Sequence, residues 1–250
     1  MIRSLPVLCF VLLLSACVTE TVGPPLIKPA APEAQLQALV DLSIGYIRNR
    51  DYNRAKENLN RALKIDPNSP QAHNAFGLVY QLEGDDEQAD IHFKKATADQ
   101  SYSRAFNNYG AYLFTQGRYQ EAIEKLEVAA NDRFYENRPL VFENLGVAYL
   151  QMNNQEAAEL AFTRATRLNP NQSRALLELA HIRYDEKNYV ESRYFYRQFV
   201  GSSQQNARSL LLCVRISRIF DDTDSEASCE LTLKNIFPAS EEYKQLEASK

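Results

Sequence analysis

The sequence predicts an all-α fold, a superhelix of about six helix-turn-helix units that follows a leader peptide and a proline-rich tether. Small residues recur about every 34 positions from residue 36 onward, a period typical of units built from two antiparallel helices. Alanines recur in a second phased series, each followed four residues later by a bulky apolar side chain. The first 16 residues differ, because a positive charge precedes a short apolar run.

The first segment has the pattern of a bacterial lipoprotein signal peptide. Arg3 precedes the apolar run 5–14, which is too short to span a bilayer as a permanent helix. The run ends in Leu14-Ser15-Ala16-Cys17, which resembles the lipobox, where the chain is cleaved and the cysteine is acylated. We therefore expect residues 1–16 to be the signal peptide and Cys17 to carry lipid. The alternative is an ordinary signal peptide with an incidental cysteine.

The residues after the cleavage site predict where the mature protein lies. Val18 follows Cys17, where an aspartate would signal retention in the inner membrane. We expect a protein that acyl chains anchor to the outer membrane and that faces the periplasm. Each buried lipid CH₂ contributes about 0.8 kcal/mol, so several chains anchor stably where one is marginal. Residues 17–35 contain four prolines and little periodic hydrophobicity, which predicts a tether.

The repeat from residue 36 onward is that of tetratricopeptide units. The residue at which the two helices of a unit touch must be small, and it recurs at intervals of 33, 36 and 34 residues as Gly77, Gly110, Gly146 and Ala180. The second helices supply the matching alanines, Ala55, Ala89, Ala122 and Ala158. The array then covers residues 36–240, in units 36–69, 70–102, 103–138, 139–172, 173–206 and a degenerate 207–240. Residues 241–250 are expected to be a capping tail.

The composition argues against catalysis and against nucleic acid as a partner. The net charge of -4 leaves no basic stripe to neutralise phosphates. The histidines His73, His92 and His181 fall on separate predicted helices, without the convergent partners that a metal site or a general base needs. We expect no enzyme activity, metal or cofactor, and a monomer apart from its complex with a partner.

Two cysteines remain in the predicted mature array. Cys213 falls in the first helix of the last unit and Cys229 in the second, on faces that should meet. In an oxidising periplasm, such a pair is expected to form a disulfide, which contributes about 3 kcal/mol for a loop of this size. The alternative is two separately buried thiols.

The register also predicts the inner, concave wall of the superhelix. First-helix residues three before, one after and four after the small position should line it, with Ser43 at that position in the first unit. The apolar residues among them are Val40, Ile44, Ile47, Leu78, Phe114, Val147 and Leu150. Apolar side chains without an intramolecular neighbour indicate a protein-binding groove. The alternative is a superhelix that closes on itself and buries them.

Three strings carry a closer resemblance. They are Asn107-Asn108-Tyr109-Gly110, Val141-Phe142-Glu143-Asn144-Leu145-Gly146 and Gln205-Asn206-Ala207-Arg208-Ser209-Leu210-Leu211-Leu212. Together with the lipobox and the repeats, they resemble the type IV pilus biogenesis and stability lipoproteins, the pilotins of the pilus secretin. Many members of that family lack cysteines at positions 213 and 229, so the resemblance does not support the disulfide.

The resemblance implies a lipoprotein that binds secretin subunits and promotes their outer-membrane localisation and their assembly into multimers, as twitching motility requires. The part of the groove nearest the anchor, formed by Val40, Ile44, Ile47 and Leu78, is favoured, because no repeat precedes it. Two alternatives remain open: a scaffold of the β-barrel insertion machinery, or a regulator of peptidoglycan synthesis.

Overall fold

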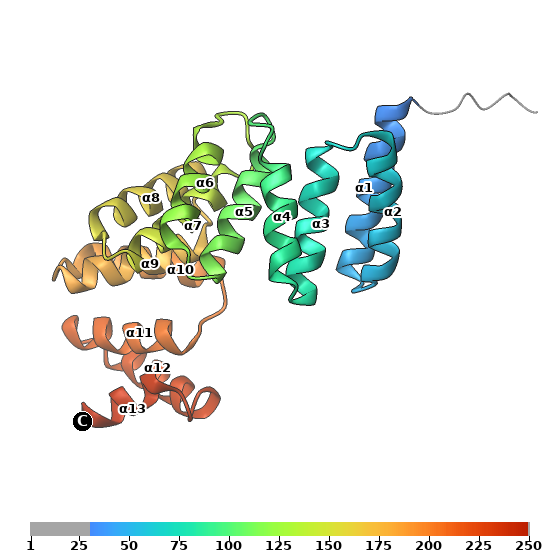
Figure 1. Cartoon of the computed structure of the whole chain (residues 1–250). Coiled ribbons are helices and arrows are strands. Elements are labelled where there is room, and N and C mark those ends of the chain that lie inside the picture. Colours follow the sequence, from blue (N-terminus) through green and yellow to red (C-terminus); the bar gives the residue numbers. More distant parts are fainter. Residues whose placement is uncertain (1–30, 250) are drawn as a thin grey trace, which may run out of the picture.

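The computed structural model describes residues 31–249, and over this range the chain forms thirteen α-helices and no strand. They make six antiparallel hairpins and a final single helix (Figure 1). In chain order the hairpins are α1 Pro32–Arg48 with α2 Tyr52–Ile65, α3 Pro70–Glu83 with α4 Asp86–Ala96, α5 Ser103–Thr115 with α6 Tyr119–Asn131, α7 Arg138–Gln151 with α8 Gln155–Leu168, α9 Ser173–Asp185 with α10 Tyr189–Ser202, and α11 Ala207–Ile219 with α12 Thr223–Ile236, followed by α13 Glu241–Ala248. The predicted fold class is confirmed.

The N-terminal boundary differs from the prediction. The signal peptide, Cys17 and most of the expected tether lie outside the described residues. Helix α1 begins at Pro32, four residues before the expected start of the array, so the tether ends at residue 31 at the latest. A proline suits the first turn of a helix, where its missing N–H has no intrahelical acceptor. Within residues 31–249 no helix is long and apolar enough to cross a membrane.

The two helices of a hairpin pack closest at the small residues of the first helix, as the repeat predicts. A Cβ on Gly77 would lie 2.7 Å from the ring of Phe93, and one on Gly110 would lie 2.6 Å from Leu126 Cγ. Heavy atoms do not approach so closely, so only glycine permits this separation of the two helices. The ring of Phe162 covers Gly146 in the same way.

Two serines take the place of small apolar residues in the first and fifth hairpins. Ser43 is fully buried, and its hydroxyl donates to Leu39 O at 2.7 Å and lies 3.2 Å from Ala55 O in α2. Ser192 of α10 donates to Ala180 O of α9 at 2.7 Å across its hairpin. Both hydroxyls are satisfied, so serine preserves the close helix contact without the cost of an unpaired buried polar group.

Each hairpin turn contains a residue in the left-handed backbone region. Gly84 and Gly117 serve the second and third hairpins, whereas the other four use Arg50, Asn153, Lys187 and Asp221, with φ between 53° and 62°. Next to the turns, aspartate or asparagine caps five of the six second helices. Asp85 is one of them and accepts from Gln88 N at 3.1 Å, and its negative charge also interacts favourably with the dipole of α4.

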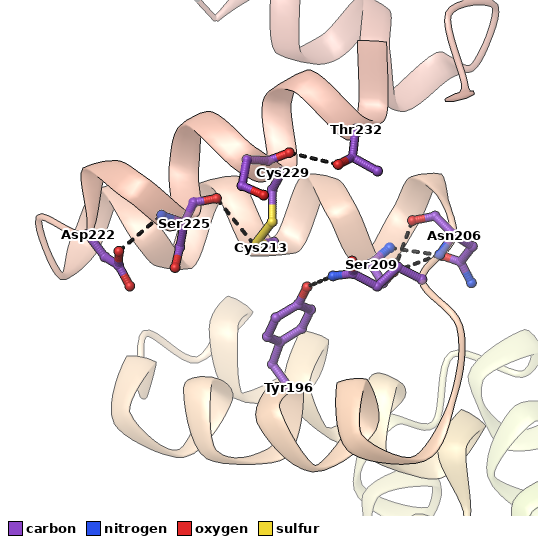
Figure 2. Close-up of a disulfide and its surroundings, with 10 residues drawn as sticks. Tyr196, Asn206, Ser209, Cys213, Asp222, Ser225, Cys229 and Thr232 are labelled. Carbon is purple, nitrogen blue, oxygen red and sulfur yellow. Dashed lines mark hydrogen bonds between the residues drawn. A yellow bond between two sulfur atoms is a disulfide. The ribbon is translucent and has the colours of Figure 1, made fainter. Parts of the chain in front are cut away.

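The C-terminal hairpin is cross-linked. A disulfide joins Cys213 of α11 to Cys229 of α12, with 6.2 Å between their Cα atoms (Figure 2). Both cysteines belong to an apolar cluster that includes Leu246 of α13, which is 1% exposed. The expected polar tail therefore forms a helix that packs on α11 and covers the end of the apolar core.

A pair of histidines lies between the two helices of the second hairpin, where His73 is buried and His92 is partly buried. His73 Nε2 lies 3.1 Å from Pro67 O, and its Nδ1 lies 3.1 Å from His92 Nδ1. A carbonyl can only accept, so Nε2 of His73 carries the proton and its Nδ1 accepts from His92. Burial lowers the pKa of both rings, that of His92 to about 4.

We predict that Gly110→Val destabilises the protein by about 1–3 kcal/mol, the usual cost of overpacking. The added side chain would meet Leu126 and also Ala122 O, a backbone atom that cannot move aside. Urea denaturation measures the change. Gly45→Ala is the control, because no atom lies within 4 Å of its added Cβ; it should be neutral or stabilising by up to about 1 kcal/mol. Equal stability of Gly110→Val and the wild type would contradict the packing account.

We predict that removing the disulfide by Cys213→Ser with Cys229→Ser lowers the free energy of unfolding by up to about 3 kcal/mol, because the unfolded chain gains freedom. Thermal unfolding with and without reductant measures this. Reductant should lower the melting temperature of the wild type and leave that of the double variant unchanged. Two free thiols in the unreduced wild type, seen by mass spectrometry, would overturn the assignment.

We predict that stability falls between pH 6.5 and about 4. The folded pKa of His92 is lowered to about 4, so in this window the unfolded chain binds more protons than the folded one, and acid favours unfolding. The loss should be on the order of 1 kcal/mol at pH 5 relative to pH 7. His92→Gln keeps an N–H donor for His73 but does not titrate, so its urea midpoint should fall less over the same interval. An equal fall in both proteins would contradict the prediction.

Candidate protein-binding surface

The first helices of successive hairpins contact one another and carry the predicted apolar wall. Ile44 and Ile47 of α1 are partly buried against the cluster that includes α3. Leu78 and Phe114 pack against the next cluster, and Leu150 against the one that follows. These five side chains keep part of their surface in solvent, so they form an interrupted apolar stripe along the array.

Val40 and Val147 do not belong to that open surface, which corrects the sequence prediction. Val40 is 5% exposed and Val147 is 7% exposed. Val40 packs with Leu36 and Leu39 in the cluster that holds α1 to α2 and α3. Neighbouring helices cover both valines, so they support the surface and offer little area to a partner. The self-closed alternative is also not what the structure describes, since the other five residues are only partly buried.

The outer edge of α1 adds a residue that the sequence analysis missed. Leu42 is 47% exposed, and Ala38 and Ala34 lie one and two turns before it on the same face of the helix. Gly45 follows, with no atom within 4 Å of the place of its Cβ. No described hairpin precedes α1 to cover this edge. The spacing of four residues between 34, 38 and 42 is the signal that could have identified it.

Asparagines form a hydrogen-bonded chain across three first helices. Asn108 Nδ2 of α5 donates to Asn74 Oδ1 of α3 at 3.0 Å, and Asn144 Nδ2 of α7 donates to Asn107 Oδ1 at 3.3 Å. Asn107 Nδ2 in turn donates to Asn108 Oδ1 at 3.4 Å. These hydrogen bonds link adjacent hairpins. The side-chain amides keep further donors and acceptors for other hydrogen bonds.

Nearer the C-terminus, glutamate side chains link the first helices of neighbouring hairpins. Glu143 is buried and accepts from Ala175 N at 3.2 Å, and burial raises the pKa of its carboxyl group. Glu178 of α9 is 7% exposed and pairs with the guanidinium of Arg208 in α11, at 2.5 and 2.9 Å. A two-pronged pair of this kind fixes the direction of both side chains. The inner wall therefore changes from apolar near α1 to charged near α11.

The surface offers the chemistry of protein recognition. Within residues 31–249 no group of three or more histidine, cysteine, aspartate or glutamate side chains is placed to hold a metal ion. The three histidines lie in three helices, and of the three only His73 and His92 contact each other. Burial lowers the pKa of His181 to about 3. Partly exposed apolar side chains beside fixed amides suit the burial of a polypeptide segment.

The fold and this surface define a tetratricopeptide-repeat protein. Residues 46–84 match the family described as TPR repeat, and residues 87–139 and 144–207 match the family described as tetratricopeptide repeat. The matched segments cover most of the first five hairpins and the start of the sixth.

Relatives that match most of the chain identify a particular family of tetratricopeptide-repeat proteins. The chain is 40% identical to the type IV pilus assembly protein PilF of Pseudomonas aeruginosa over 238 residues, which cover 95% of this chain and 94% of the relative. The solved structure of P. aeruginosa PilF superposes with a TM-score of 0.85 at 41% identity, covering 88% of this chain and 99% of that one. This chain belongs to the family of the type IV pilus assembly protein PilF.

A more distant structure shares the fold. PilW, described as a widely conserved type IV pilus biogenesis factor, is 23% identical and superposes with a TM-score of 0.69, covering 88% of this chain and 99% of that one. At this identity the likeness concerns the arrangement of the helices alone.

Proposed function

We propose that this protein is an outer-membrane lipoprotein that binds the secretin subunits of the type IV pilus and promotes their localisation and assembly into the multimeric pore. The observation that carries the proposal is the 40% identity with a type IV pilus assembly protein along 95% of the chain. Secretin as the partner follows from the pilotin resemblance of the sequence, and the lipid anchor from the lipobox that ends at Cys17.

The binding site in this proposal is the first hairpin. Leu42 offers about half of its surface at the uncovered edge of α1, and Ile44 and Ile47 offer less at the inner wall. Complete burial of a leucine or isoleucine side chain contributes about 1.5–3 kcal/mol, so even half-buried residues supply useful affinity when a partner covers them together. An unassembled pore subunit exposes apolar surface, which such an edge would shield.

The position of this edge fits the anchor. Cys17 lies 15 residues before the start of α1 at Pro32, so among the described helices α1 is the nearest in sequence to the proposed lipid anchor. A client bound at α1 would be held close to the membrane in which the pore assembles. The anchor fixes the place of assembly and the apolar edge supplies the contact, and neither step needs a cofactor.

The test is a strain that lacks the gene and is complemented with variants. Leu42→Glu should reduce detergent-resistant secretin multimers at least about tenfold, because a carboxylate at the contact costs more than 1.4 kcal/mol when it is desolvated. Ile44→Glu with Ile47→Glu should abolish them. Leu231→Glu is the matched control, since Leu231 is 59% exposed on α12. Circular dichroism should show the same helicity for Leu42→Glu, the control and the wild type.

Normal multimers and normal twitching with both Leu42→Glu and the double isoleucine variant would refute the first hairpin as the site. Deletion of the gene should leave total porins and cell-wall sensitivity unchanged. A general loss of porins would instead favour a β-barrel insertion scaffold, and altered cell-wall sensitivity would favour a regulator of peptidoglycan synthesis. Fractionation of Cys17→Ser tests the anchor, because this variant should leave the outer-membrane fraction.

A further inference from the structure

A groove of about 380 Å³ runs between α6 and α8, with α7 as its floor. The buried side chains of Phe142 and Leu145 form the apolar bottom, and Leu160 of α8, which is 53% exposed, forms one wall. Phe142, Leu145 and Tyr149 line the groove and lie three and four residues apart on one face of α7, whereas the wall positions Val147 and Leu150 lie on another face of the same helix. The groove is therefore separate from the surface to which we assign secretin.

Three arginines surround this groove. The guanidinium carbon of Arg138 lies 5.4 Å from the centre of the Phe142 ring, and that of Arg164 lies 5.6 Å from the same centre. Arg133 joins them from the segment between α6 and α7. Stacking on the ring holds the two planar groups in place, so little side-chain freedom remains to be lost when they bind an anion.

The arginines of the groove lack carboxylate partners among the described residues. Arg138 Nε donates to Ala130 O at 3.0 Å, which leaves the outer nitrogens of its guanidinium for another acceptor. Other arginines of the chain are neutralised, for example Arg118 by Asp90 at 2.8 Å and Arg218 by Glu226 at 2.7 Å. The three arginines of the groove thus form no ion pair within the part of the chain that the structure describes.

The one acidic side chain that lines the groove is already engaged. Glu127 Oε1 accepts from the hydroxyl of Tyr149 at 2.7 Å. With three guanidinium groups against one carboxylate, the lining carries a net positive charge. A low-dielectric floor strengthens its attraction for an anion.

We propose that this groove binds an acidic segment of a partner protein, with carboxylates on the arginines and an apolar side chain against the exposed Leu160. Guanidinium groups pair with carboxylates through two parallel hydrogen bonds, which gives direction as well as charge complementarity. The groove is recessed between two helices, so a polypeptide segment can enter it, whereas a flat membrane surface cannot. The proposal adds a second contact to the one in the proposed function and does not rest on it.

Fluorescence anisotropy with the full-length mature protein in detergent tests this proposal. The probe is a labelled peptide of Glu and Leu in a Gly-Ser background, with one matched peptide that has Gln for each Glu and another that has Ser for each Leu. The Glu-Leu peptide should bind, and both matched peptides should bind at least about tenfold more weakly, since charge-assisted pairs and a buried leucine each contribute more than 1.4 kcal/mol. Equal binding of all three peptides, or no binding of the Glu-Leu peptide, would overturn the proposal.

Variants locate the binding. Arg138→Gln with Arg164→Gln should weaken it at least about tenfold, because both ring-stacked cations are lost. Arg167→Gln with Arg174→Gln removes the same charge from outside the groove and should leave binding unchanged. Since Arg138 also bonds the backbone, Leu160→Glu serves as a second variant that keeps all three arginines and should weaken binding through repulsion. Unchanged affinity for the Glu-Leu peptide in both groove variants would contradict the assignment. Binding of phosphatidylglycerol vesicles through these arginines, without binding of the peptide, would also contradict it.

Discussion

The close approach of the two helices in each hairpin is the constraint on which the rest of the structure depends. Where Gly77, Gly110 and Gly146 face a ring or a leucine, an added methyl group would have no room. Because the two helices of a hairpin pack at this short separation, successive hairpins can pack on one another, and they stack in chain order (Figure 1). Stacked repeats of this kind bury a continuous core although each unit alone could not.

The stack leaves two different surfaces for partners. The first helices form an inner wall that is apolar near α1, amide-rich across α3 to α7 and charged near α11. Between the second helices α6 and α8, the groove around Phe142 contains arginines that form no ion pair with a described carboxylate. One surface therefore suits an apolar client and the other an acidic segment.

The sequence predicted the helical hairpins and their register well, because the spacing of Gly and Ala reports directly on helix contact. It also placed Cys213 and Cys229 on faces that meet across α11 and α12, where the structure joins them (Figure 2). The sequence did not predict correctly which apolar side chains of the first helices are exposed. Val40 and Val147 follow the groove register yet are buried, since the coverage of a wall residue depends on the tilt of the neighbouring hairpin, which repeat spacing does not encode. Leu42 was overlooked because an uncovered edge exists only at the first hairpin, whereas the repeat register describes interior ones.

The most direct measurement is photo-cross-linking in living cells, with benzoylphenylalanine in place of Leu42 at the edge of α1 and, separately, of Leu231 on α12. Both positions are exposed, so the probe should not disturb the fold at either. The account predicts that irradiation joins the protein to a secretin subunit from position 42 and not from position 231. Secretin captured only from position 231, or from neither position in cells that assemble normal multimers, would contradict it.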